Sequence, residues 1–164
     1  MADNTFSQAR LNQAIDDTLT IVWNEIKYKA AIVKNYGNLP PVTCNIGEIK
    51  QVLVNLLVNA AHSIKEKGTI NITTSADDDH VYIQIQDTGS GIPQDNLKKI
   101  FDPFFTTKPV GKGTGLGLYI TASIIEKHNG KITVESRIGA GSTFKIKLPI
   151  KFKTADTEAE EVAA

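Results

Sequence analysis

The 164-residue chain has 41% hydrophobic and 22% charged residues, which is typical of one soluble globular domain with a substantial core. Its eighteen basic and eighteen acidic residues cancel, which argues against a nucleic-acid-binding protein that works through a basic surface. The single cysteine, Cys44, excludes an internal disulfide, and no apolar run approaches the ~20 residues that span a membrane. We therefore expect a cytoplasmic domain that contacts neither nucleic acid nor membrane, whether or not the full-length protein is membrane-anchored.

The residue pattern divides the chain into a lead, one folded domain and a tail. Residues 1–10 are expected to be disordered, residues 11–150 to fold, and the acidic, alanine-rich residues 151–164 to form a disordered tail or a linker. In the first half of the domain, the pattern predicts a helix over Leu11–Lys27, a strand over Tyr28–Tyr36 and a long helix over Ile46–Lys67. A hairpin of Thr69–Thr74 with Val81–Gln86 follows, and then a short helix near Gln94–Lys99. The domain closes with a helix over Leu118–Lys127 and a second hairpin of Lys131–Ser136 with Ser142–Pro149. Because the helices do not alternate strictly with the strands, we expect an α+β two-layer sandwich, with a mixed sheet covered on one face by about three helices.

The helix predicted over Ile46–Lys67 carries two asparagines on one face. Asn45 is a plausible N-cap, and Glu48 three residues later completes a capping-box-like pattern. Asn55 and Asn59 lie four residues apart, close to the apolar stripe. A pair of carboxamide oxygens in a cleft can bind Mg²⁺, which often completes its shell with phosphates, but the same amides could cap backbone groups or each other. The helix alone leaves both interpretations open.

The loop Asp87–Pro93 has the sequence DTGSGIP and follows a predicted strand. At the sheet edge, the Asp87 carboxylate could accept a hydrogen bond from an exocyclic amino group such as that of adenine. Gly89 and Gly91 would let the backbone approach a flat ligand closely. Taken alone, the loop is better explained as an ordinary Asp-Gly turn.

The stretch Ile100–Ile120, IFDPFFTTKPVGKGTGLGLYI, contains four glycines within seven residues, directly before a predicted helix. Such a loop presents free backbone N–H groups and the positive end of the helix dipole, and Lys108 and Lys112 add positive charge. We interpret it as a mobile lid over a polyphosphate. For the glycine string alone, a surface loop followed by a core helix would be the better explanation.

In this order and spacing, the three strings closely resemble the ATP-binding catalytic domain of sensor histidine kinases, within the gyrase, heat-shock chaperone, histidine kinase and mismatch-repair ATPase superfamily. The resemblance runs from about Leu11 to Pro149. The asparagine helix resembles the N box, DTGSGIP the first glycine box, IFDPFFTTK the phenylalanine box, GTGLGL the second glycine box and GAGSTFKIKLP the closing strand pair. The resemblance implies a Bergerat-type fold with ATP and Mg²⁺ as cofactors. It also implies transfer of the γ-phosphoryl group to a histidine on a dimerisation domain absent from this chain, with a response regulator as an indirect partner.

The resemblance also implies roles for single residues. Asn59 would be the Mg²⁺ ligand, with Asn55 as a second contact to metal or phosphate, and Asp87 would accept a hydrogen bond from the adenine amino group. Phe104 and Phe105 would dock the lid. The other residues of the implied nucleotide site are Gly89, Gly91 and Ile92 around the base, Ser142, which would hold the base through a water, Thr143 beside it, His62, Lys108, and the segment Gly113, Thr114, Gly115, Leu116, Gly117 and Leu118.

Two departures from the family pattern bear on the activity. Superfamily members that hydrolyse ATP carry a glutamate general base four residues before the metal-binding asparagine, and here that residue is Asn55, whose amide cannot take a proton. Many kinases have Lys and Tyr where this chain has His62 and Ser63, so a phosphate contact there is in question. None of the three histidines lies in the family's acceptor pattern, and His80 and His128 are expected at the surface or as helix caps.

Two other functions remain open. A stand-alone serine kinase or anti-sigma factor of the same superfamily would also bind ATP, and a nucleotide-dependent interaction module would bind it weakly or not at all. Because phosphoryl transfer depends mainly on positioning and charge stabilisation, we expect the domain without its acceptor helices to bind Mg-ATP and turn it over poorly.

Overall fold

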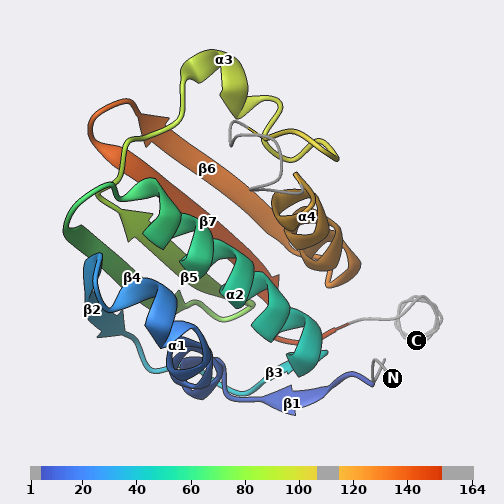
Figure 1. Cartoon of the computed structure of the whole chain (residues 1–164). Helices are drawn as coiled ribbons and strands as arrows, with labels where there is room; N and C mark the ends of the chain where they lie inside the picture. Colours follow the sequence, from blue (N-terminus) through green and yellow to red (C-terminus); the bar gives the residue numbers. More distant parts are fainter. Residues whose placement is uncertain (1–4, 107–114, 153–164) are drawn as a thin grey trace, which may run out of the picture.

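A five-stranded mixed sheet forms one layer of the molecule and helices form the other (Figure 1). The structure, a computed structural model, describes residues 5–106 and 115–152. The strand order is β2 (Ala30–Tyr36), β4 (Gly68–Ala76), β5 (His80–Asp87), β7 (Gly141–Pro149) and β6 (Lys131–Arg137), and only β2 and β4 pair in parallel. Helices α1 (Leu11–Ile26), α2 (Ile46–Ser63) and α4 (Gly117–Lys127) cover one face, and the short α3 (Gln94–Leu97) lies near β6. The predicted two-layer α+β sandwich is confirmed.

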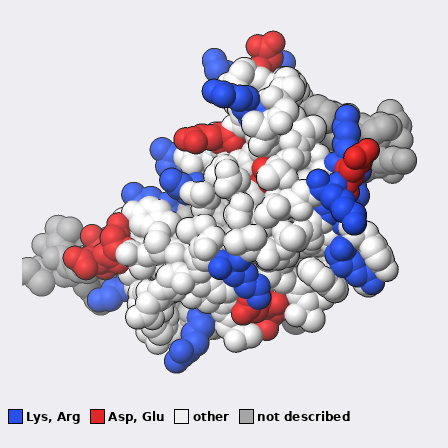
Figure 2. Space-filling view, turned by 90° about the vertical axis from the view of Figure 1, so that its left-hand side faces the viewer, with Lys and Arg blue, Asp and Glu red and all other residues white. Residues whose placement is uncertain are grey.

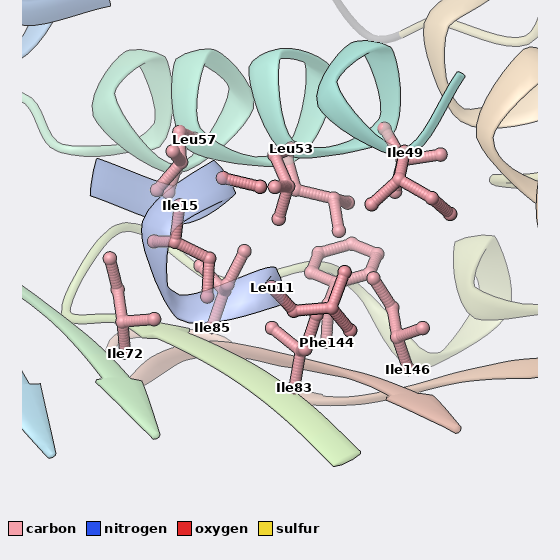
Figure 3. Packing of buried hydrophobic residues seen from close by; sticks show 14 of the residues in the cluster. Leu11, Ile15, Ile49, Leu53, Leu57, Ile72, Ile83, Ile85, Phe144 and Ile146 are labelled. Atoms are coloured by element: carbon pink, nitrogen blue, oxygen red, sulfur yellow. The ribbon is translucent and has the colours of Figure 1, made fainter. Parts of the chain in front are cut away.

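The core fills the space between α2 and the sheet (Figure 3). Along β5, the buried Ile83 and Ile85 alternate with the less buried Tyr82 and Gln84, because successive side chains of a strand point to opposite faces. The side chains that meet in this layer come from α1, α2, β4, β5 and β7 and include Leu11, Ile15, Ile49, Leu53, Leu57, Ile72, Ile83, Ile85, Phe144 and Ile146. The other face of the sheet carries mostly polar side chains.

Most predicted boundaries agree with the structure to within two residues, and two predictions differ by more. Within the lead that was expected to be disordered, β1 (Ser7–Ala9) pairs antiparallel with β3 (Val42–Cys44), because the edge of β3 offers unpaired backbone groups. The long helix ends at Ser63, before the predicted Lys67, because Ile64 leaves the helical conformation at φ −88° and ψ 117° and buries its side chain in the core. The N-cap prediction is confirmed, since the Asn45 side chain accepts a hydrogen bond from the Glu48 N–H at 3.1 Å.

His128, at the end of α4, is a buried structural residue that is only 2% exposed. Its Nε2 accepts a hydrogen bond from the Asn45 N–H at 3.1 Å, and its Nδ1 lies 2.8 Å from the Ile124 carbonyl oxygen. Since a carbonyl only accepts, the proton sits on Nδ1 and the imidazole is neutral. The ring also packs on Phe6, which stacks on Phe152. His128 therefore joins α4 to the start of α2 inside the fold.

We expect His128→Phe to lower the free energy of unfolding by about 1–3 kcal/mol, the usual cost of a buried group left without its partner. The new ring keeps the packing against Phe6 but leaves the Asn45 N–H without its acceptor. Urea denaturation measures the change. The matched control is His80→Phe on the partly exposed β4–β5 hairpin, and equal losses in the two variants would contradict the role of His128.

Charged side chains of both signs are scattered over the face shown in Figure 2, with wide uncharged areas between them. The mixture of signs agrees with the balanced composition, and the face shown carries no basic stripe. None of the helices within residues 5–106 and 115–152 combines the length and the apolar character needed for a membrane crossing.

Candidate functional site

A cavity of about 440 Å³ opens between α2, the loop that follows β5 and the first turn of α4. The described residues that line it are Val54, Asn55, Val58, Asn59, His62, Ser63, Asp87, Ser90, Gly91, Ile92, Pro93, Ile100, Phe105, Thr106, Gly115, Gly117, Leu118 and Ser142. The predicted asparagine helix, the glycine-containing loop Asp87–Pro93 and the two ends of the predicted lid, residues 100–106 and 115–118, which we call the lid stem, therefore meet at one place. Asp87 is the only carboxylate among these lining residues.

Asp87 is the last residue of β5, and its side chain is only 4% exposed. Its Oδ1 accepts hydrogen bonds from the Gly89 N–H at 2.8 Å and from the Ser142 N–H at 3.3 Å. Burial raises the pKa of Asp87, and the hydrogen bonds from Gly89, Ser63 and Ser142 oppose that shift. The site thus holds a desolvated carboxyl group whose orientation is fixed by backbone N–H donors.

Gly89 and Gly91 are required where the loop Asp87–Pro93 closes onto the rest of the protein. A Cβ on Gly89 would lie 2.1 Å from the Ser63 Oγ, and a Cβ on Gly91 would lie 2.2 Å from the Arg137 carbonyl oxygen. Gly91 also has a φ of 79°, which favours glycine. These glycines therefore shape the cavity, as the resemblance implies, and they do so by letting the loop pack against the ends of α2 and β6.

The two asparagines of α2 differ in what their side chains contact. The Asn55 Nδ2 donates to the Gly117 carbonyl oxygen at 3.1 Å and to the Thr121 Oγ1 at 3.3 Å, and its Oδ1 accepts from Gln51 at 2.9 Å. Asn59 lies one turn later, lines the cavity and makes no side-chain hydrogen bond with any residue in the two described ranges. Asn55 thus joins α2 to the start of α4, while the Asn59 carboxamide is available to a ligand.

The phenylalanines before the glycine-rich stretch have different environments. Phe105 packs against the core and lines the cavity. The ring of Phe101 packs edge-on against that of Phe144, with 6.4 Å between the ring centroids. Phe104 is 73% exposed and adopts a φ of 68°, and its N–H donates to the Gly115 carbonyl oxygen at 2.9 Å. Phe105 therefore packs inward as the docking prediction expects, whereas the Phe104 side chain faces outward because its backbone is turned to pair with Gly115.

Part of the predicted lid can be placed. Gly115, Gly117 and Leu118 line the cavity, and Leu116 is the N-cap residue of α4. The predicted phosphate contacts Lys108, Gly113 and Thr114 lie outside the described residues, as does most of the glycine-rich segment.

Of the remaining predicted residues, Ser142 and His62 line the cavity and Thr143 does not. Ser142 lines the cavity, but Thr143 points to the opposite face of the sheet because side chains alternate along β7, and it borders a shallow hollow there. His62 lies at the cavity rim, where its Nε2 is 3.3 Å from the Glu25 Oε2 of α1. The structure thus brings Ser142 and His62 to the site and leaves Thr143 outside it.

Several lining residues were not predicted. Val54 and Val58 lie one position before each of the two asparagines and share their face of α2, so the helical period could have identified them. Ser63 lies four residues after Asn59, so the same period places it on that face, whereas Ile100 carries no such signal because it reaches the cavity from a segment distant in sequence.

The family model described as histidine kinase-, DNA gyrase B-, and HSP90-like ATPase matches residues 44–151. The chain belongs to this family. The matched segment contains the asparagine helix, the loop after β5, the lid stem and the closing strands, so the resemblance inferred from the motifs is confirmed.

Relatives of this ATPase-family domain are sensor kinases. The sensor kinase CckA of Brucella abortus (strain 2308) is 46% identical over 136 residues, which cover 73% of this chain and 14% of that protein. The solved catalytic domain of histidine kinase ThkA, in a nucleotide-free form, is 36% identical with a TM-score of 0.80, covering 89% of this chain and 98% of that one. The complex of ThkA with the response regulator protein TrrA matches with 32% identity and a TM-score of 0.74, covering 88% of this chain and 42% of ThkA.

The chain spans between 14% and 35% of the length of the curated relatives that it matches. It corresponds in length and in fold to the catalytic domain of ThkA.

Proposed function

We propose that this domain binds Mg-ATP in the cavity between α2 and α4 and donates the γ-phosphoryl group to a histidine on a dimerisation domain of the full-length protein. The observation that carries the proposal is that the buried Asp87 carboxyl group lines the same cavity as the Asn59 carboxamide, which bonds to no group within residues 5–106 and 115–152. The volume of about 440 Å³ suits a nucleotide base and sugar, since ligand sites commonly measure roughly 300–1,000 Å³.

In this proposal Asp87 recognises the base. Its carboxylate accepts a hydrogen bond from the exocyclic amino group of adenine, while the Gly89 and Ser142 N–H groups hold it in place. Ile92, Val58 and Ile100 supply apolar surface against which a flat ring can pack. The site thus combines one polar anchor with an apolar wall, as nucleotide pockets commonly do.

The donor set in the cavity fits Mg²⁺ bound together with phosphate. Asn59 would hold the ion through its carboxamide oxygen, because Mg²⁺ prefers oxygen ligands and often takes only one or two from protein. When bound, the ion neutralises charge that develops on the phosphates during transfer. Asn55 supports the site by holding the start of α4, whose first residues Gly117 and Leu118 line the same cavity.

The cavity is built for binding and transfer and is poorly suited to hydrolysis. Asp87 is its only carboxylate among the described lining residues, and the Asp87 Oδ1 is occupied by two backbone N–H donors. Asn55, at the position of the hydrolytic glutamate, cannot take a proton from water. Productive turnover therefore needs the acceptor domain, and we propose that a response regulator receives the phosphoryl group from that histidine, in keeping with the ThkA–TrrA complex.

The test is a transfer assay with γ-labelled ATP and Mg²⁺, in which this domain is mixed with the separately purified dimerisation domain of the same full-length protein. We expect the label to appear on that domain, to be lost in acid and to survive base, as phosphohistidine does. Acid-stable label on a serine would support the serine-kinase alternative. Absence of ATP binding by calorimetry would support an interaction module.

A further inference from the structure

Ser136, on β6, contacts three segments around the base end of the cavity, although it is not among the described residues that line it. Its Oγ lies 2.7 Å from the Ile92 N, 3.1 Å from the Gly141 carbonyl oxygen and 2.7 Å from the Ser142 Oγ. One partly buried hydroxyl therefore links the loop after β5, the β6–β7 turn and the cavity-lining Ser142.

The hydrogen-bonding capacity of a hydroxyl decides how these contacts are arranged. A serine Oγ offers one proton and two lone pairs. The Ile92 N–H can only donate, so it occupies one lone pair, and the Gly141 carbonyl can only accept, so it takes the proton. The second lone pair of Ser136 must then accept the proton of Ser142. All three contacts are satisfied at once only in this arrangement.

With its proton committed to Ser136, the Ser142 Oγ faces the cavity as a hydrogen-bond acceptor. Ser142 is also joined to the adjacent acceptor, because its N–H donates to the Asp87 Oδ1 at 3.3 Å. These two neighbouring acceptors, the Asp87 carboxylate and the Ser142 Oγ, can bind the two protons of an amino group, either directly or through a water. They repel a carbonyl oxygen at the same place.

We propose that Ser136 is a positioning residue that sets Ser142 as an acceptor and thereby makes the base site select a 6-amino purine over a 6-oxo purine. The inference rests on the proposed ATP-binding function and adds a determinant of its base specificity. It predicts that removing the Ser136 hydroxyl frees the Ser142 proton to turn toward the cavity, where it can donate to a 6-oxo group.

The experiment compares the dissociation constants of ATP and inosine triphosphate, which differ at the 6-position of the base, for the whole chain by calorimetry. For Ser136→Ala we expect the ratio of the two dissociation constants to fall by roughly tenfold relative to the unaltered chain, about the equilibrium effect of one hydrogen bond. Ser136→Thr keeps the hydroxyl and should restore the ratio. Ser123→Ala, which removes an exposed α4 hydroxyl bonded only within its own helix, should leave it unchanged.

An equal loss of affinity for both nucleotides in Ser136→Ala would overturn the inference, since a hydroxyl that merely supports the loop would weaken both alike. Failure of Ser136→Thr to restore discrimination, with thermal unfolding unchanged, would overturn it as well. If the unaltered chain bound neither nucleotide, the proposed function would fail first and this inference with it, so the two failures are distinguishable.

Discussion

Asp87→Asn should weaken ATP binding strongly and at the same time raise the melting temperature of the nucleotide-free domain. The amide keeps an oxygen that can accept from the Gly89 and Ser142 N–H groups, so the loop stays in place. It loses the charged acceptor proposed for the adenine amino group, and hydrogen bonds to charged groups contribute about 1.5–3 kcal/mol. We therefore expect the dissociation constant of ATP to rise by roughly 10- to 150-fold.

The gain in stability follows from the direction of the Asp87 pKa shift. Burial raises the pKa of Asp87 above the ordinary value of 3.8 for an aspartate, so the folded domain holds this proton more tightly than the unfolded chain. The stabilisation from this group is complete below that ordinary value and is lost as the pH rises through the folded-state pKa. Above the folded-state pKa the ionised, buried carboxylate thus lowers the free energy of unfolding, a cost that a neutral amide does not carry.

Thermal unfolding at neutral and at mildly acidic pH, with and without Mg-ATP, measures both effects. The melting temperature advantage of Asp87→Asn should shrink as the pH is lowered, and nucleotide should stabilise this variant much less than it stabilises the unaltered chain. Asp95→Asn on the exposed first turn of α3 is the matched control and should resemble the unaltered chain. A variant of Asp87 that binds ATP normally would exclude Asp87 as the base anchor.

Asn59→Ala should remove the effect of Mg²⁺ on ATP binding while leaving the fold intact. The side chain makes no hydrogen bond within the described part of the chain, so its loss leaves no partner unsatisfied there. If its oxygen is the protein's ligand to the ion, the strengthening of ATP binding by Mg²⁺ should fall by about tenfold or more, since even outer-shell changes cost 10–100-fold in metal affinity.

Asn55→Ala provides the comparison, because it removes an amide of the same size one turn earlier. The loss frees the Gly117 carbonyl oxygen and the Thr121 hydroxyl from their bonds to α2. We expect it to lower the free energy of unfolding by about 1 kcal/mol or more and to weaken ATP with and without Mg²⁺ alike. Calorimetric titrations of both variants with ATP, each with Mg²⁺ and with a chelator, separate the two patterns. Identical patterns would contradict the division of roles between the asparagines.

The elements of this fold were largely predictable because their signals are local. The apolar stripe of α2 and the alternation in β5 and β7 follow from side-chain geometry within a few residues, and both hairpins formed as predicted. The motif strings likewise identified Asn59 and Asp87, which the structure brings to one cavity. Periodicity could not show that the lead contributes β1, because that strand depends on β3, more than thirty residues away.

By itself, then, the sequence determined the α+β class, the helix and strand positions and the family, because spacing and residue type are properties of short segments. Only the tertiary structure decided what each candidate residue contacts. It tied Asn55 to α4, left Asn59 available in the cavity, turned Thr143 away from it and placed Ser136 behind Ser142. The physical reason is that the partners of a side chain are set by backbone segments that meet across the fold. Gly141 is an example, because a Cβ at this position would lie 2.0 Å from the Asp87 carbonyl oxygen, so only glycine lets the two segments come together.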